Sequence, residues 1–119
     1  MLILIIDSSI QIIERLEEII SEAENITAIH RAVSYAEAKK LFKENKYAAV
    51  LLDIDLPEND SLKLLTEIKK NGKETCVIIL FTHIDNYTQE EYKFLGADFF
   101  CDKYYDFEKI SGLLAVHHL

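Results

Sequence analysis

Several polar side chains come directly after apolar runs, and their types suit the binding of a divalent cation and a phosphoryl group. In chain order they are Asp7, Asp53, Asp55, Thr82, His83 and Lys103. Carboxylates such as Asp7 and Asp53 bind hard cations through oxygen, and Asp53 can also act as a nucleophile that forms an acyl phosphate. The Thr82 hydroxyl and the Lys103 ammonium can donate to phosphoryl oxygens that a metal leaves uncovered. We therefore expect a cleft that binds Mg²⁺ and a phosphoryl group.

These residues come together only if the apolar runs are parallel strands of one sheet. Strand-like and helix-like patterns alternate in a (βα)5 order, with strands expected over residues 2–6, 26–30, 48–52, 77–81 and 99–101. The first, third and fourth runs are continuously apolar, as in central strands whose two faces are both covered by helices. Ligands of such α/β sheets bind beyond the carboxyl ends of the strands, where the polar residues lie.

Three helix starts are marked by polar residues. Ser34 with Glu37, and Thr88 with Glu91, have capping-box spacing, in which each side chain satisfies the other's free backbone N–H. Asp106 is a natural N-cap for the last helix. We expect these residues to begin the second, fourth and fifth helices.

Length, charge and hydropathy limit the organisation and the partners of the chain. A chain of 119 residues has the size of one domain, so we expect a single domain over residues 1–119. The net charge of −8 opposes direct binding to nucleic acid. The apolar runs are too short to span a membrane, and no basic segment precedes the first one, so we expect a cytoplasmic protein.

Five sequence segments follow the pattern of a response-regulator receiver domain in the correct order. They are LIIDSS at residues 4–9, VLLDIDLP at 50–57, IILFT at 78–82, GAD at 96–98, and finally Lys103. The chain therefore resembles a receiver domain of two-component signalling over essentially its whole length. The resemblance implies a flavodoxin-like (βα)5 three-layer sandwich whose parallel five-stranded sheet has the strand order 2-1-3-4-5.

The resemblance also implies a role for each residue of the cleft. Asp53 matches the phosphoacceptor, and Asp7 matches the first of two paired metal-site acids. Asp55 matches the position whose backbone carbonyl binds the metal. Thr82 matches the switch hydroxyl, and Lys103 matches the phosphate-binding lysine.

The function implied by the resemblance is phosphorylation-dependent signalling. A histidine kinase or phosphotransfer protein would donate the phosphoryl group to Asp53, and the phosphorylated domain would switch its binding of a downstream protein or of a second copy of itself. No enzymatic activity is implied beyond self-phosphorylation and self-dephosphorylation at Asp53.

Four residues depart from the family pattern. Ser8 occupies the position of the second acid, so we expect weaker Mg²⁺ binding with at most a hydroxyl at this position. His83 replaces a small residue beside Thr82 and would restrict access to the phosphoryl pocket. Tyr104 stands where a proline usually follows Lys103, which predicts a trans peptide and a different direction for the lysine. Ser61 replaces a glycine, which predicts a different loop after Pro57.

Two other functions compete with the phosphoacceptor. Ser8, His83 and Tyr104 favour a degenerate receiver that binds partners independently of phosphorylation. LDID at residues 52–55 also resembles the nucleophile-plus-acid motif of a haloacid-dehalogenase-type phosphatase. That class places the motif early in the chain and needs a later acidic pair, and the mid-chain position of Asp53 argues against it.

Overall fold

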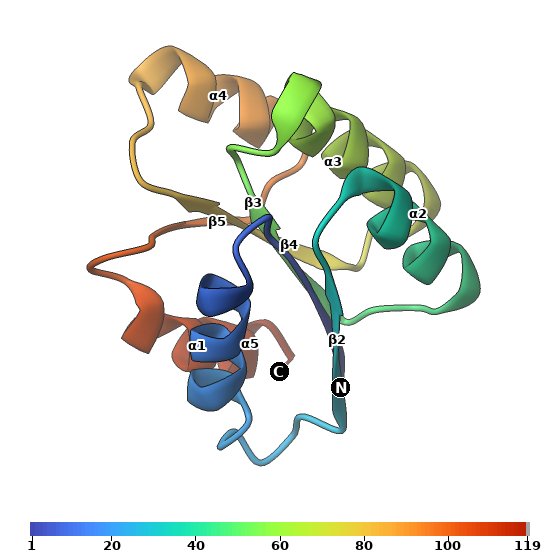
Figure 1. Cartoon of the computed structure of the whole chain (residues 1–119), viewed down its shortest axis with the longest axis vertical. Coiled ribbons are helices and arrows are strands. Elements are labelled where there is room, and N and C mark those ends of the chain that lie inside the picture. The colour runs from blue at the N-terminus through green and yellow to red at the C-terminus, as the bar shows by residue number, and fades with distance from the viewer. Residues whose placement is uncertain (119) are drawn as a thin grey trace.

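The computed structural model describes residues 1–118 and contains a five-stranded parallel sheet with helices on both faces (Figure 1). The strands are β1 (Leu2–Ile6), β2 (Ala28–Ala32), β3 (Ala49–Asp53), β4 (Cys76–Phe81) and β5 (Phe99–Asp102). Their order in the sheet is β2-β1-β3-β4-β5. The predicted fold class, strand order and central position of the three apolar strands are therefore confirmed.

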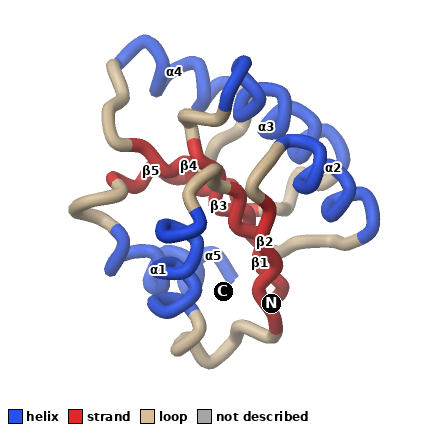
Figure 2. The backbone as a smooth tube through the Cα atoms, viewed as in Figure 1, coloured by secondary structure: helices blue, strands red, loops and turns tan. Residues whose placement is uncertain are grey.

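The helices form two layers, one on each face of the sheet (Figure 2). They are α1 (Ile10–Ile20), α2 (Tyr35–Glu44), α3 (Asp60–Asn71), α4 (Asn86–Phe94) and α5 (Ile110–His118), and short 3-10 turns cover Pro57–Asn59 and Phe107–Lys109. Helices α1 and α5 contribute to one hydrophobic cluster, and α2, α3 and α4 contribute to the other. No helix within residues 1–118 is long and apolar enough to cross a bilayer.

Alternate residues of the central strands supply the two clusters. In β1, Ile3 and Ile5 pack in the cluster that contains α1 and α5, whereas Leu4 and Ile6 pack in the cluster of the other three helices. All four side chains are fully buried, and burial of each such side chain contributes about 1.5–3 kcal/mol. An uninterrupted apolar run is therefore required by a strand that has no solvent-facing side.

Ser34 begins α2 as predicted. Its hydroxyl accepts a hydrogen bond from the backbone N–H of Glu37 at 3.3 Å. The Glu37 carboxylate accepts from the N–H of Val33 at 2.9 Å, one residue before the position that a capping box requires.

The predicted starts of the fourth and fifth helices are wrong. Helix α4 begins at Asn86, because the Asp85 carboxylate accepts the N–H of Thr88 at 2.7 Å and acts as the N-cap. Asp106 precedes a 3-10 turn and makes no capping hydrogen bond. Its carboxylate instead accepts the N–H of Asp102 at 2.9 Å, which closes the loop after β5.

Candidate functional site

The sheet carries three charged side chains to its carboxyl edge. Asp7 directly follows β1, Asp53 ends β3, and Lys103 directly follows β5. Sheet-like hydrogen bonds continue past two of these strands, since the N–H of Asp7 donates to Ala32 at 3.1 Å and that of Lys103 donates to Phe81 at 2.8 Å. The backbone therefore fixes the height of each side chain above the sheet.

Asp7, Asp53 and Lys103 meet in one buried cluster, which we call the acidic site. The Lys103 Nζ atom lies 3.0 Å from Asp7 Oδ2 and 2.9 Å from Asp53 Oδ1. The lysine is 8% exposed and each aspartate is 1% exposed. The convergence expected from the sequence is thus present for these three residues.

Backbone N–H groups hold the two carboxylates in place. The N–H of Ser9 donates to Asp7 Oδ1 at 2.9 Å, and the N–H of Asp55 donates to Asp53 Oδ1 at 2.9 Å. Each is an Asx-type bond to the residue two positions later, which a strand-ending aspartate can form without moving the sheet. Asp7 Oδ2 is buried and accepts no hydrogen bond, although the Lys103 ammonium lies beside it.

The electrostatics of the site reflect two acids that share one base. Burial raises the pKa of Asp7, and the nearby Asp53 raises it further, against the opposing effects of the Ser9 N–H and Lys103. Burial by itself lowers the pKa of Lys103, but its close contacts and charge interactions with Asp53 and Asp7 outweigh burial and raise that pKa. The lysine is therefore charged at neutral pH, and its single positive charge does not balance two carboxylates.

The other predicted residues differ in how far they are exposed to solvent. The Asp55 side chain is exposed, which agrees with a contribution through its backbone alone. Thr82 is half-buried, whereas Ser8 and His83 are exposed. Within residues 1–118, no side-chain hydrogen bond or ion pair joins Ser8, Thr82 or His83 to Asp7, Asp53 or Lys103, so their roles stay predictions.

The direction predicted for Lys103 is wrong. The peptide bond to Tyr104 is trans, yet the lysine still reaches both carboxylates. The Asp102 carboxylate orders the loop, because it accepts the N–H groups of Tyr104 at 2.7 Å and Tyr105 at 3.3 Å. Sequence reasoning missed Asp102, whose four-residue spacing to Asp106 was the available signal.

The loop after Pro57 contains two residues with left-handed backbone, Glu58 at φ 58° and Asn59 at φ 59°. It leads into α3 at Ser61, which is 1% exposed. The Ser61 hydroxyl lies 3.0 Å from the Ile54 carbonyl and 2.7 Å from the Tyr92 hydroxyl. Neither hydroxyl was predicted as functional, because this contact depends on how α3 and α4 pack.

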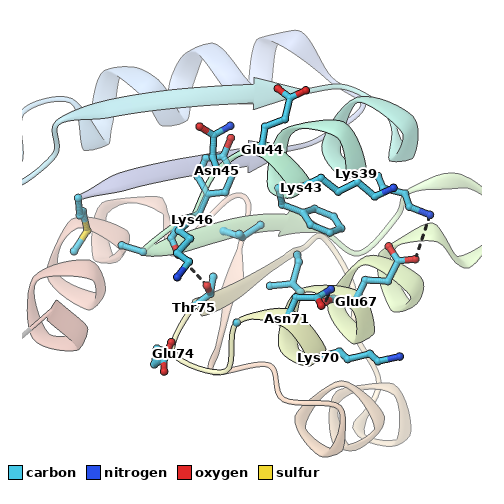
Figure 3. Close-up of a pocket in the computed structure, with 17 residues that line it drawn as sticks. Lys39, Lys43, Glu44, Asn45, Lys46, Glu67, Lys70, Asn71, Glu74 and Thr75 are labelled. Atoms are coloured by element: carbon cyan, nitrogen blue, oxygen red, sulfur yellow. Dashed lines mark hydrogen bonds and ion pairs between the residues drawn. The ribbon is translucent and has the colours of Figure 1, made fainter.

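A groove in the described part of the chain is lined by none of the residues of the acidic site (Figure 3). Its volume is about 1150 Å³, and it lies between α2 and α3, where Asn45 and Thr75 border the amino ends of β3 and β4. Lys39 and Glu67 face one another across its rim at 3.8 Å, both partly exposed. It contains none of the site residues predicted from the sequence.

The acidic site fits a hard cation with few protein ligands. Asp7 and Asp53 supply buried carboxylate oxygens, and Asp7 Oδ2 lacks a hydrogen-bond donor. No group of three acidic, histidine or cysteine side chains gathers as a metal site within the described residues. A cation held here would therefore keep several waters, as Mg²⁺ usually does.

Comparisons with known proteins agree with this geometry. The family model for the response regulator receiver domain matches residues 3–115. The transcriptional regulatory protein SrrA of Staphylococcus aureus is 36% identical over 96 residues, which cover 81% of this chain and 39% of SrrA. The chain thus spans less than half the length of this relative.

Solved structures show the same fold. A two-component response regulator from Clostridium difficile is 21% identical with a TM-score of 0.88, and the match covers 98% of this chain and 94% of that one. The response regulator TrrA from Thermotoga maritima, solved with Mg²⁺ and BeF, is 28% identical with a TM-score of 0.82, covering 98% and 97%.

The chain belongs to the response-regulator receiver family. It is a receiver domain of two-component signalling. Domains of this family are signalling modules that bind Mg²⁺ at an acidic phosphorylation site. The family assignment argues against the haloacid-dehalogenase-type phosphatase, which is a different class of protein. It does not decide between an active and a degenerate receiver, because that choice depends on individual site residues.

Proposed function

We propose that Asp53 accepts a phosphoryl group from a histidine kinase or phosphotransfer protein and that the domain thereby switches its binding of a downstream partner. The observation that carries this proposal is the buried Lys103 ammonium held between Asp7 and Asp53. Two acids and one base leave an excess of negative charge that a cation would balance. The lysine already lies where it can follow a phosphoryl oxygen on Asp53.

In the proposed reaction, a carboxylate oxygen of Asp53 attacks phosphorus and forms the O–P bond of an acyl phosphate. The P–N bond to the donor imidazole breaks, and the ring nitrogen keeps the electron pair. Lys103 pairs with the phosphoryl oxygens, and Thr82 donates its hydroxyl to one of them. Mg²⁺ bound by Asp7, Asp53 and the Asp55 carbonyl would neutralise the negative charge that phosphoryl transfer concentrates in the site.

The degenerate receiver has one observation in its favour. Lys103 pairs with both carboxylates at the same time, so a cation must compete with an ion pair that is already formed. Ser8 supplies no charge to help that competition. On this alternative, the domain would bind its partner in the same way whether or not a donor is present.

Intact mass spectrometry after incubation with acetyl phosphate and Mg²⁺ distinguishes the two functions. We expect one phosphoryl adduct on the native chain, dependent on Mg²⁺ and absent from Asp53→Asn. Asp98→Asn is the matched control, because Asp98 lies at the amino end of the sheet beside Lys69 and its substitution should leave the adduct in place. If neither acetyl phosphate nor a panel of phosphorylated histidine kinases gives an adduct, the phosphoacceptor function is refuted.

A further inference from the structure

Three oxygen atoms connect the loop after Asp53 to helix α4. The Ser61 Oγ atom lies 3.0 Å from the carbonyl oxygen of Ile54 and 2.7 Å from the hydroxyl of Tyr92. Ser61 is 1% exposed and Tyr92 is 4% exposed, so water does not compete for these bonds. Ser61 is in the first turn of α3, and Tyr92 is in α4.

The direction of these hydrogen bonds follows from the number of protons. The Ile54 carbonyl only accepts, so the single hydroxyl proton of Ser61 is donated to it. The Tyr92 hydroxyl must then donate to Ser61. Burial raises the pKa of Tyr92, and its hydroxyl therefore keeps the proton that it donates. The chain of bonds runs in one direction, from Tyr92 through Ser61 to Ile54.

The same peptide group joins this chain to Asp53. The Ile54 carbonyl and the Asp55 N–H belong to one peptide unit, and that N–H donates to Asp53 Oδ1 at 2.9 Å. A peptide unit is planar and rotates as a whole. A change at the Asp53 carboxylate that weakens its bond to Asp55 therefore turns the carbonyl that Ser61 holds. Phosphorylation is such a change, because it converts a charged carboxylate into a neutral acyl group with weaker hydrogen-bond acceptors.

We propose that Ser61 and Tyr92 are positioning residues that couple α4 to the state of Asp53 through the Ile54–Asp55 peptide. This inference rests on the proposed function and adds the route by which the phosphoryl group is sensed. Helix α4 carries Tyr87 and Phe94, which are 81% and 89% exposed. A shift of α4 therefore changes the presentation of two large apolar side chains to a partner.

Tyr92→Phe removes the first donor of the chain and keeps the packed ring. Tyr47→Phe is the matched control, because Tyr47 is 5% exposed and its hydroxyl also makes a hydrogen bond. That bond, 2.7 Å long, joins it to His30 Nδ1, which is not part of the acidic site. Ser61→Ala breaks the same chain at its middle. Because either substitution already interrupts the series of hydrogen bonds, the effects of Tyr92→Phe and Ser61→Ala should not add in the double variant.

The first measurement is the amide resonance of Asp55 in the unphosphorylated protein by two-dimensional NMR. We expect Tyr92→Phe and Ser61→Ala to move this resonance and Tyr47→Phe to leave it in place. An Asp55 resonance that does not respond to Tyr92→Phe overturns the coupling. This measurement does not depend on phosphorylation, so it decides the coupling even if the proposed function fails.

The second measurement is hydrogen exchange across residues 86–94 with acetyl phosphate and Mg²⁺, with the adduct counted by mass in the same sample. We expect phosphorylation to change exchange in the native chain and in Tyr47→Phe. In Tyr92→Phe the adduct should form equally, but the exchange change should fall about fivefold, the effect of one hydrogen bond. A full exchange change in phosphorylated Tyr92→Phe overturns the coupling, whereas a native chain that takes no adduct from acetyl phosphate or from the panel of phosphorylated histidine kinases refutes the proposed function instead.

Discussion

Two lysine–aspartate sites lie at opposite ends of the sheet and differ in charge balance. At the amino end, Lys69 Nζ lies 2.8 Å from Asp98 Oδ2 and donates to the Thr75 carbonyl at 2.7 Å. The same oxygen of Asp98 accepts the N–H of Val77 at 2.8 Å. One base therefore meets one acid, and the bonds of the pair tie α3 to β4 and the start of β5.

At the carboxyl end, one base meets two acids. Lys103 pairs with Asp7 and Asp53, and Asp7 Oδ2 still accepts no hydrogen bond. The amino-end pair is also more exposed, at 16% and 32% for its side chains, than the carboxyl-end group, at 10% or less. A balanced pair of this kind stabilises the fold, whereas the excess negative charge at the carboxyl end favours the binding of a further cation.

The largest expected effect comes from removing each lysine. In metal-free buffer, Lys103→Met should lower the free energy of unfolding by about 3 kcal/mol, because it leaves two buried carboxylates without a base. Lys69→Met should cost about 1 kcal/mol, since Asp98 keeps its bond to Val77 and has access to water. Urea unfolding at neutral pH measures both. Equal losses would show that the charge balance of the two sites does not matter.

The amino-end site should also be sensitive to backbone changes that leave the acidic site intact. Gly96 has φ +111°, and a Cβ atom there would lie 2.9 Å from Cγ of Lys69. Gly96→Ala should therefore destabilise the domain by about 2 kcal/mol through backbone strain and displacement of the lysine. Gly112→Ala is the control, because a Cβ there would meet no atom within 4 Å apart from its chain neighbours and the backbone of its own helix. Phosphorylation of the folded Gly96 variant by acetyl phosphate should be normal, and its loss would mean that the two ends are not independent.

The sequence predicted most of the fold because strand and helix patterns depend on local periodicity. The five strands were placed within two residues, and Asp7, Asp53 and Lys103 were expected together because parallel strands end at one edge. The second strand begins at Ala28 rather than residue 26, since it pairs in register with β1 from Leu2 onward. That register is a contact between distant segments and leaves no mark in the local pattern.

The missed features share this dependence on distant contacts. The Lys69–Asp98 pair and the Ser61–Tyr92 pair each join residues about thirty positions apart. The start of α4 was misplaced for a different reason, because Asp85 and Thr88 are both acceptable N-caps and only the backbone geometry decides between them. The residue pattern therefore does not predict which distant side chains meet, or which of two possible N-caps begins a helix.

Magnesium binding should depend on the unbalanced site alone. Asp7→Asn removes one of two buried carboxylates, so we expect the affinity for Mg²⁺ to fall about tenfold or more. Asp98→Asn should leave that affinity unchanged, because its carboxylate belongs to the balanced pair. Titration of each variant with Mg²⁺ by calorimetry or NMR gives both constants. An equal effect of the two substitutions would place the cation somewhere other than the acidic site.

The smallest expected effect is a pH dependence whose sign differs between two aspartates. The pKa of Asp7 is raised in the folded protein by burial and by Asp53, so the folded state binds this proton more tightly than the unfolded chain does. Ionisation of Asp7 therefore lowers the free energy of unfolding as pH rises from its ordinary value of 3.8 through the higher folded value. In metal-free buffer Asp7→Asn should be more stable than the native chain at neutral pH, with a smaller gain in acid.

Asp85 supplies the opposite sign. The N–H of Thr88 lowers the pKa of this capping carboxylate, so its contribution to stability is present above 3.8 and is lost as pH falls through the lower folded value. Asp85→Asn should therefore reduce stability at neutral pH, with a smaller reduction in acid. Urea unfolding of both variants between pH 3 and pH 7 measures the two slopes. The effects of Asp7→Asn and Asp85→Asn on the free energy of unfolding should change in opposite directions as pH rises. If they changed in the same direction, the assignment of an unfavourable negative charge to Asp7 would be wrong, because removal of a charge stabilises the folded protein only where the fold disfavours that charge.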